Sequence, residues 1–357
     1  LHHHNRTLHP VQLRFLGSTG LVKGCECHAN ALAYGAKSPW SVLMRPFYPL
    51  LLVTSLLSLT ACVGTRELAP TPTAPAPAPI AAVTPTDNYE LDGLKAIMWT
   101  RTSAEAEALY LQGYQMARLA LDQALADKNW TAAVEQKGDF GSLPPAIIVD
   151  IDETVLDTSD HMVDRLRNGQ PFTKKAWNDY VQDANATPLP GALSFLKYAA
   201  SRGVTIFYVS NREGVAPAPD LKSELEPTRR NLAQFGFPNS EDTRTFLFRD
   251  ASRGWREKSP RRAVVAQTHR IVLMAGDNLY DFIDIEEPTR ERRDAAVEDR
   301  ASWLGTRWIV LPNPMYGSWE SLLIGQQSGA AARRAALESV GVPGAAADTI
   351  AKGGFEP

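Results

Sequence analysis

The chain has 357 residues, 44% of them hydrophobic and 22% charged, which is typical of a globular protein with one large domain or two small ones. Its formal net charge of −3 argues against a protein that binds nucleic acid through a broad basic face. The three cysteines lie at positions 25, 27 and 62, so the rest of the chain has no disulfide and must fold on its own core.

Residues 1–43 show no clear amphipathic period, and a targeting pattern begins only at Met44. We therefore expect 1–43 to be an upstream extension that is not translated. Cys25 and Cys27, with histidines nearby, raise the alternative of a metal site. Their Cys-x-Cys spacing is shorter than the usual gap between zinc ligands, and no second pair follows, so we do not favour that site.

Residues 44–61 have the layout of a secretory signal, with a positive start, an apolar stretch and small residues at the end. Residues 59–62 read LTAC and resemble the lipoprotein box of bacteria, whose cysteine is lipidated after cleavage. We expect lipid on Cys62 to anchor the protein firmly, because each buried CH₂ contributes about 0.8 kcal/mol. An ordinary signal peptide with an incidental cysteine is the alternative.

Residues 62–87 combine Cys62 with a run of alternating proline and alanine. Such a run favours extended, polyproline-like chain at about 3.1 Å per residue, so it predicts a tether that holds a domain away from a membrane. Val63 follows the cysteine, where Gram-negative lipoproteins retained in the inner membrane commonly carry Asp. The resemblance thus implies the outer membrane, with the domain in the periplasm or at the cell surface.

The folded domain is expected over residues 88–325, with a helical part over 88–145. Residues 103–127 carry tyrosines and leucines at helical spacing, and Ser103 is an acceptable N-cap. We interpret the aromatic stripe of this helix as core.

From residue 146 on, short β-rich apolar runs alternate with helix-like segments. The runs span 146–149, 204–210, 245–248, 270–276 and 307–312. The helix-like segments between them include 191–203 and 225–236. This alternation predicts an α/β fold with a Rossmann-like parallel sheet and helices on both faces. Ligands of such sheets bind beyond the carboxyl ends of the strands.

One apolar run leads straight into acidic residues, in the stretch IIVDIDETVLDT, where Asp150, Asp152 and Thr154 alternate. Carboxylates that stay ionised close together need a cation, and hard oxygen ligands favour Mg²⁺ or Ca²⁺. A calcium loop of the EF-hand type would need Gly and Glu where this chain has Val155 and His161, so that reading fails. Carboxylates that merely cap a turn are the remaining alternative, but they predict no partners downstream.

Such partners are present, each at a predicted strand end or helix start. Ser210 closes the run VTIFYVSNR, and Lys258 precedes a predicted helix. Asp277 and Asp281 follow another strand in MAGDNLYDF. This ordered set resembles the four-part signature of the haloacid dehalogenase-like phosphohydrolases.

The resemblance narrows to one family. IIVDIDETVLDTSDH, IVLMAGDNLYDF and the segment from residue 291 are similar to the class C acid phosphatases, the lipoprotein e group of bacterial surface lipoproteins. The similarity covers about residues 90–325 and implies a small helical cap inserted over about 157–200. His161 is a departure, since the family usually carries Tyr there.

The resemblance implies roles for the motif residues. Asp150 would be the nucleophile that forms an aspartyl-phosphate, and Asp152 the general acid and then the base. Ser210 and Asn211 would bind phosphoryl oxygens. Lys258 would pair with Asp150 and with the phosphoryl group.

The implied cofactor is Mg²⁺. Asp150 and Asp277 would supply side-chain ligands, and Asp152 its backbone carbonyl. Asp281 would orient the waters of the metal without binding it directly. Thr154 is expected among the substrate-binding residues, where its hydroxyl would fix the loop rather than react.

The expected substrates are small phosphomonoesters such as nucleoside 5′-monophosphates, not nucleic-acid polymers. By resemblance, Trp177 of the insert and Tyr316 sandwich a nucleobase, with plain core packing as the alternative for both. Two other functions stay open: a related phosphatase or phosphotransferase for a non-nucleotide substrate, and a surface lipoprotein that binds without turnover. The Ala- and Gly-rich tail, 326–357, is expected to hold a short helix.

Overall fold

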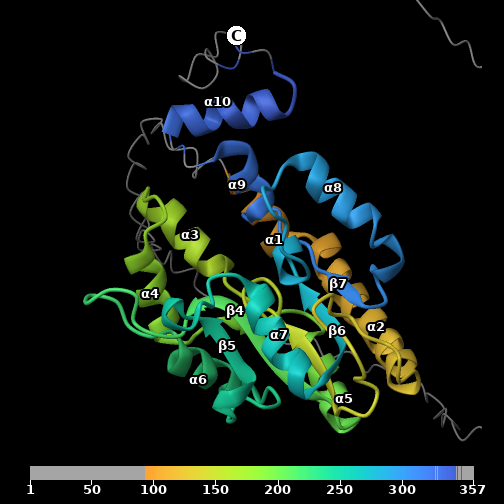
Figure 1. The fold of residues 1–357 in the computed structure, drawn as a ribbon. Helices are drawn as coiled ribbons and strands as arrows, with labels where there is room; N and C mark the ends of the chain where they lie inside the picture. Colours follow the sequence, from red (N-terminus) through yellow and green to blue (C-terminus); the bar gives the residue numbers. More distant parts are fainter. Residues whose placement is uncertain (1–92, 326, 328, 343, 345–346, 348–357) are drawn as a thin grey trace, which may run out of the picture. The chain divides into compact units, whose positions relative to one another are not determined.

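The computed structural model of the chain describes residues 93–325, 327, 329–342, 344 and 347 (Figure 1). The expected upstream extension, the signal segment, Cys62 and the proline-rich tether lie outside these residues. In the part of the chain that the structure describes, every helix is too short or too polar to cross a lipid bilayer.

A parallel sheet forms the centre of the described domain. Its five strands are β1 (Pro145–Val149), β4 (Thr205–Glu213), β5 (Phe246–Arg249), β6 (Arg270–Gly276) and β7 (Trp308–Val310). They lie side by side in the order β5-β4-β1-β6-β7, and every neighbouring pair is parallel. The five apolar runs of the sequence are therefore these five strands, and the predicted α/β class is confirmed.

The helical N-terminal part consists of α1 (Leu94–Thr102) and α2 (Ala104–Ala126). Ser103 caps α2, because its hydroxyl accepts a hydrogen bond of 3.0 Å from the backbone N–H of Ala106. The structure differs from the predicted helical part at its end, since residues 127–144 form turns and irregular chain before β1.

Helices cover both faces of the sheet, as Figure 1 shows. One face carries α2, α5 (Ala192–Ser201) and α6 (Leu225–Phe235), and the other carries α7 (Lys258–Thr268). Along β1 the side chains alternate between the two layers: Ile147 and Val149 lie in one core cluster and Ile148 lies in the other. Burial on both faces explains why all of β6 is apolar apart from its first residue.

A small subdomain is inserted between β1 and α5. It contains a two-stranded antiparallel ribbon, β2 (Leu156–Asp157) and β3 (Thr187–Pro188), with α3 (Ser159–Asn168) and α4 (Lys174–Asp183) between them. The cap predicted over about 157–200 is thus shorter in the structure, because Phe195 and Leu196 of α5 lie in the main core. Arg101 of α1 bonds Ser159 and Asp160, which attaches the cap to the N-terminal helices.

The remaining elements are short. They are α8 (Arg290–Glu298), α9 (Ser318–Ile324), α10 (Gly329–Ser339) and the 3₁₀ turns η2 (Thr243–Thr245), η3 (Ala251–Arg253), η4 (Leu279–Asp281) and η5 (Ala301–Trp303). The helix expected in the tail is α10. The segment from β7 to α9 leads the chain back over the carboxyl ends of the strands, toward the cap.

Candidate active site

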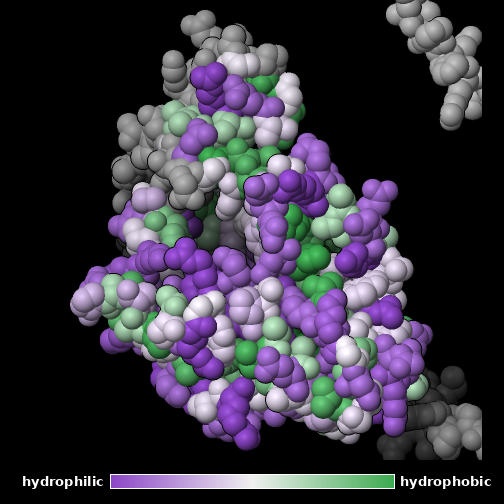
Figure 2. Space-filling model, in the orientation of Figure 1, coloured by the Kyte–Doolittle hydropathy of each residue, from purple (hydrophilic) through white to green (hydrophobic). Residues whose placement is uncertain are grey.

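A cavity of about 1090 Å³ opens at the carboxyl ends of the strands. In the space-filling view the surface is hollowed between α3 and α9 (Figure 2). Carboxylates form the floor of the cavity: Asp150, Asp152, Asp277 and Asp281. The cap supplies one wall with His161, Phe172 and Trp177, and the C-terminal segment supplies the opposite wall with Tyr316, Trp319 and Ile324.

Asp150 is held at the rim by a backbone hydrogen bond to β6 and by an ion pair with the first residue of α7. Its backbone N–H donates a hydrogen bond of 3.0 Å to Ala275 of β6, so the pairing of β1 continues by one residue past the strand. Lys258, the first residue of α7, brings Nζ to 2.7 Å from Oδ1 of Asp150 and 2.7 Å from Oδ1 of Asp281. The lysine side chain is only 3% exposed, so this double ion pair is shielded from water.

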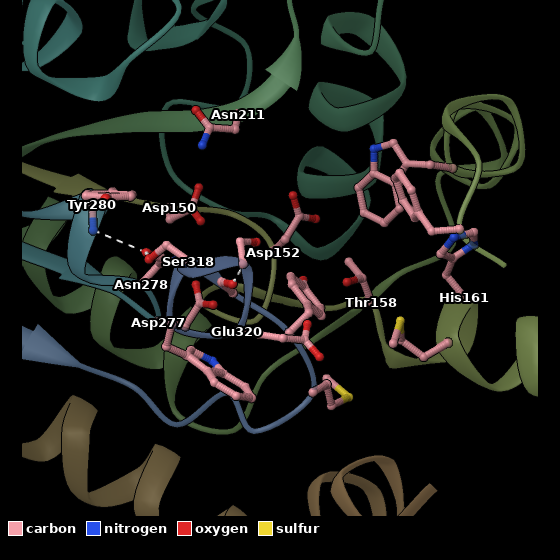
Figure 3. A pocket seen from close by; sticks show the side chains of 18 of the residues that line it. Asp150, Asp152, Thr158, His161, Asn211, Asp277, Asn278, Tyr280, Ser318 and Glu320 are labelled. Carbon is pink, nitrogen blue, oxygen red and sulfur yellow. Dashed lines mark hydrogen bonds between the residues drawn. The ribbon is translucent and has the colours of Figure 1, made fainter. Parts of the chain in front are cut away.

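Three carboxylates share this corner of the cavity. Asp150, Asp277 and Asp281 each place a carboxylate oxygen within 4.8 Å of the other two. Figure 3 shows Asp150, Asp152 and Asp277 in the middle of the pocket, with Thr158 and His161 to one side. Thr154 lies beneath the cluster: its hydroxyl donates to Oδ1 of Asp277 at 3.2 Å, and the residue is fully buried.

Burial and crowding shift the proton affinities of this cluster. Burial, with the nearby Asp281 and Asp152, outweighs the ammonium of Lys258 and raises the pKa of Asp150 to about 7. Burial, with the nearby Asp281 and Asp150, raises the pKa of Asp277 well above its usual value. Burial opposes the charge of Lys258, but Asp150 and Asp281 outweigh it and raise its pKa, so the lysine stays protonated.

The donor set therefore fits a divalent cation. Three ionised carboxylates beside one ammonium leave two negative charges, which a divalent ion would neutralise. All the ligand atoms are hard oxygens, the type that Mg²⁺ prefers. Each carboxylate has about four acceptor positions, so the hydrogen bonds to Asp277 from Thr154 and Asn313 leave room for a metal.

Asp152 faces away from this cluster and toward an arginine. Nη2 and Nε of Arg212 lie 2.7 and 3.1 Å from Oδ1 of Asp152, and Nε lies 3.3 Å from Oδ2. Arg212 is itself buried, at 3% exposure. Glu153, the next residue, turns inward in the left-handed region at a φ of 50° and is bound by the amide and hydroxyl of Thr158.

Ser210 and Asn211 lie where β4 loses its regular register with β5. Ser210 is fully buried, its hydroxyl accepts from the backbone N–H of Arg212 at 3.2 Å, and it does not line the cavity. Asn211 does line the cavity, and its Oδ1 accepts from Nη2 of Arg261 at 2.6 Å. The fully buried Arg261 also binds the carbonyl of Ser210 at 2.5 Å, so it fixes this bend.

The two expected stacking residues lie on opposite walls. Trp177 is part of an aromatic group in the cap, with its ring 5.4 Å from His161 and 5.7 Å from Tyr180 between centroids. Tyr316 belongs to the loop after β7, which Asn313 fixes by accepting from the backbone N–H of Met315. Both residues line the same cavity, Trp177 from the cap and Tyr316 from the C-terminal segment.

Sequence reasoning missed three polar residues that hold the site together: Arg212, Arg261 and Asn313. Arg212 and Arg261 are charged and buried in the core, and a buried charge needs a partner. This burial, which becomes known from the structure, is the signal that identifies them. Asn313 stands between two prolines directly after a strand, a place where an amide side chain commonly replaces missing backbone bonds.

Comparisons with known proteins agree with this architecture. A family model described as HAD superfamily, subfamily IIIB (acid phosphatase), matches residues 86–319. The chain is similar to the class C acid phosphatase of Bacillus anthracis, with 36% identity and a TM-score of 0.60 over 70% of this chain and 96% of that one. A second structure of that enzyme, with tungstate bound, gives 35% identity and a TM-score of 0.60 over 70% and 97%.

The chain has an α/β fold with acidic residues at the carboxyl edge of its sheet, and it matches acid phosphatases over most of that fold. Together these findings identify it as a phosphomonoester hydrolase. The chain belongs to the acid phosphatases of HAD subfamily IIIB, the class C acid phosphatases. The family implies small phosphoester substrates, and members of this superfamily generally use a divalent metal.

Proposed function

We propose that the protein is a Mg²⁺-dependent acid phosphatase that hydrolyses nucleoside 5′-monophosphates and similar phosphomonoesters through an aspartyl-phosphate on Asp150. One observation carries this proposal. The Asp150 carboxylate lies on the cavity floor, 2.7 Å from the Lys258 ammonium and next to two further carboxylates. Such an arrangement orients a carboxylate nucleophile and at the same time offers positive charge to an incoming phosphate.

In the first step a carboxylate oxygen of Asp150 attacks phosphorus, and the bond between phosphorus and the ester oxygen breaks. Asp152, protonated at this point, gives its proton to the departing oxygen, so the leaving group departs as an alcohol. This requirement for a protonated Asp152 favours an acid pH optimum. Lys258 balances the charge on Asp150 and on the phosphoryl oxygens, and Asn211, which lines the cavity, would lie beside them.

In the second step water attacks the phosphorus of the aspartyl-phosphate. Asp152, now ionised, accepts a proton from the water, and the bond between phosphorus and Asp150 breaks to release inorganic phosphate. The carboxylate of Asp150 and the proton on Asp152 are thereby restored. The similar Bacillus enzyme has a structure with tungstate bound, and tungstate is a tetrahedral oxyanion like phosphate, which supports the proposal that this chain also binds such an oxyanion.

Side chains of Asp150 and Asp277 and the backbone carbonyl of Asp152 would hold the Mg²⁺, and Asp281 would orient its waters. Bound Mg²⁺ would neutralise the negative charge that otherwise keeps a carboxylate and a phosphate apart. Asp281 is already fixed for that role, by Lys258 and by the backbone N–H of Asn278 at 2.8 Å.

The nucleotide preference is supported by the two aromatic walls. A base between Trp177 and Tyr316 would gain about 1–3 kcal/mol per stacked face with little discrimination between bases. The phosphate would then reach the carboxylate floor between the walls.

The test is phosphate release from p-nitrophenyl phosphate at mildly acid pH. We expect EDTA to abolish activity and Mg²⁺ to restore it, and Asp150→Asn to be inactive with or without metal. Adding glycerol as a competing acceptor tests the covalent intermediate. The ratio of glycerol phosphate to free phosphate should then be the same for every substrate, since all share one phosphoenzyme; a ratio that varies with the leaving group would exclude it.

We also propose that the enzyme is an outer-membrane lipoprotein, with Cys62 as the lipidated residue. The sequence pattern around Cys62 and the proline-rich run after it support this proposal. In a Gram-negative host, wild-type protein should sediment with outer membranes and Cys62→Ala should be soluble or remain unprocessed. Equal outer-membrane recovery of both forms would contradict the anchor.

A further inference from the structure

The contact between Arg212 and Asp152 is too specific to be a chance surface pair. Arg212 directs two N–H groups to the same oxygen, Oδ1, at 2.7 and 3.1 Å, while its approach to Oδ2 is longer, at 3.3 Å. The arginine side chain is 2% exposed and the aspartate side chain 17%. A planar guanidinium with its donors in a fixed fork orients a carboxyl group better than a flexible ammonium does.

The guanidinium is itself held from other sides. Its Nη1 donates to the hydroxyl of Thr228 in α6 at 2.8 Å, and that hydroxyl donates in turn to the carbonyl of Glu224 at 2.6 Å. The indole of Trp177 lies with its centroid 5.6 Å from Cζ of Arg212. Arg212 thus connects the loop after β1, the helix α6 and the cap.

A general acid needs such support. Asp152 lies on a loop, and proton transfer requires its oxygen to reach the departing oxygen within hydrogen-bond distance. Small errors in placement cost rate steeply, so the residue that aims an acid affects the reaction without touching the substrate.

We propose that Arg212 is the positioning residue of the general acid. It holds Oδ1 of Asp152 with two shorter hydrogen bonds and Oδ2 with one longer bond, so the more weakly held Oδ2 is the oxygen that carries the proton to the leaving group. This inference rests on the proposed function, in which Asp152 protonates the leaving oxygen. The alternative is that Arg212 only ties β4 to α6 and has no part in proton transfer.

Two substrates of similar size distinguish a positioning role of Arg212 from a purely structural one. p-Nitrophenolate leaves readily without a proton, whereas the alkoxide of benzyl phosphate needs one. The measured quantity is kcat/KM, because it reports the step in which the ester bond breaks and not the later hydrolysis of the phosphoenzyme.

We expect Arg212→Met to lower kcat/KM for benzyl phosphate by on the order of 100-fold and for p-nitrophenyl phosphate by less than about tenfold. Arg212→Lys should show the same selectivity with a smaller loss, since it keeps the charge and loses the fork. Thr228→Val should show the same selectivity with a still smaller loss, because it removes one anchor of the guanidinium and keeps the shape of the side chain. This variant decides the question if the Arg212 variants do not fold.

Two controls complete the set. Asp152→Asn should show the full selectivity for the leaving group. Arg270→Lys changes another buried arginine, whose Nη1 binds the carbonyls of Ala124 and Asp127 at the opposite end of β6, and it should show no selectivity.

Equal losses on both substrates in the Arg212 and Thr228 variants, with selective loss in Asp152→Asn, would overturn the positioning role and leave the proposed function intact. Equal losses in Asp152→Asn itself would overturn the role of Asp152 as acid, and the inference with it. Inactivity of Asp150→Asn together with selective loss in the Arg212, Thr228 and Asp152 variants supports both.

Discussion

Asn313 donates a hydrogen bond of 2.8 Å from Nδ2 to Oδ2 of Asp277. Its other amide atom, Oδ1, accepts from the backbone N–H of Met315 at 3.0 Å. One side chain therefore joins a carboxylate of the floor to the loop that carries Tyr316 on the cavity wall. A partner that orients a metal ligand in this way commonly affects metal affinity by about 10–100-fold.

Asn313→Ala should therefore weaken the binding of Mg²⁺ by about 10–100-fold, because Asp277 loses its fixed orientation. Isothermal titration calorimetry of the metal-free protein with MgCl₂ measures this directly, without any substrate. Asn231→Ala is the matched control: Asn231 is a buried amide that bonds both backbone groups of Ala186. That change should lower stability and leave Mg²⁺ affinity unchanged, and unchanged affinity in Asn313→Ala would refute the role assigned to Asn313.

Gly276, the last residue of β6, has no room for a side chain. A Cβ there would lie 2.2 Å from Oδ2 of Asp281. Gly276→Ala should therefore displace Asp281 from Lys258 and from the amide of Asn278. We expect a loss of about 1–3 kcal/mol in the free energy of unfolding, and weaker Mg²⁺ binding.

The cause of that loss can be isolated in a double-mutant cycle. Asp281→Gly removes the Oδ2, Cγ and Cβ atoms with which the new methyl group collides. Adding Gly276→Ala to it should therefore cost far less than adding it to the wild type. Chemical denaturation of the four proteins gives the coupling. Additive losses would mean that the strain at Gly276 lies elsewhere.

Trp177→Ala should raise KM for nucleoside 5′-monophosphates by roughly 5–100-fold, the loss of one stacked face. It should leave KM for a small ester such as glycerol phosphate nearly unchanged. Tyr316→Ala should show the same pattern from the opposite wall. An equal rise for nucleotide and small ester would instead indicate that Trp177 only supports the cap through His161 and Tyr180.

The buried imidazole of His161 predicts a dependence of stability on pH. Burial lowers the pKa of His161, against a smaller opposing effect of Asp164. The unfolded chain therefore takes up a proton near pH ~6.5 while the folded protein does not, so stability falls as the pH drops below that value, until the folded pKa is reached. His161→Phe removes this loss.

Urea denaturation at about pH 8 and about pH 5 checks the prediction for His161. The variant should gain stability relative to wild type on going from the higher to the lower pH. If the difference in stability between the variant and the wild type is the same at both pH values, His161 is protonated freely in the folded protein.

Much of the fold followed from local patterns. Strands β1 and β6 are buried on both faces, so their sequences are continuously apolar and recognisable, and the helix α2 was marked by its spacing and by Ser103. The end of the cap was not recognisable, because the apolar face of α5 packs on the sheet and a sequence does not say against which element a helix packs.

Some residues of the site could likewise be predicted from local sequence patterns, and others could not. Asp150 and Asp277 were identified because each follows a strand, and the carboxyl ends of parallel strands meet at one edge. Arg212 and Asn313 act through contacts with residues 60 and 36 positions away along the chain, and no local pattern reports such pairs. Ser210 was placed on the correct strand, but its spacing did not reveal that it is fully buried, at the last position before the register of β4 shifts.

The central claim is that a divalent cation bound by Asp150 and Asp277 lets Asp150 accept phosphate. Crystals of the metal-free enzyme soaked in MnCl₂ and measured at the manganese absorption edge test it most directly. We predict an anomalous peak in contact with carboxylate oxygens of both aspartates, absent from Asp277→Asn, a variant that should also lose activity. A fully active enzyme with no peak at these two residues would contradict the account.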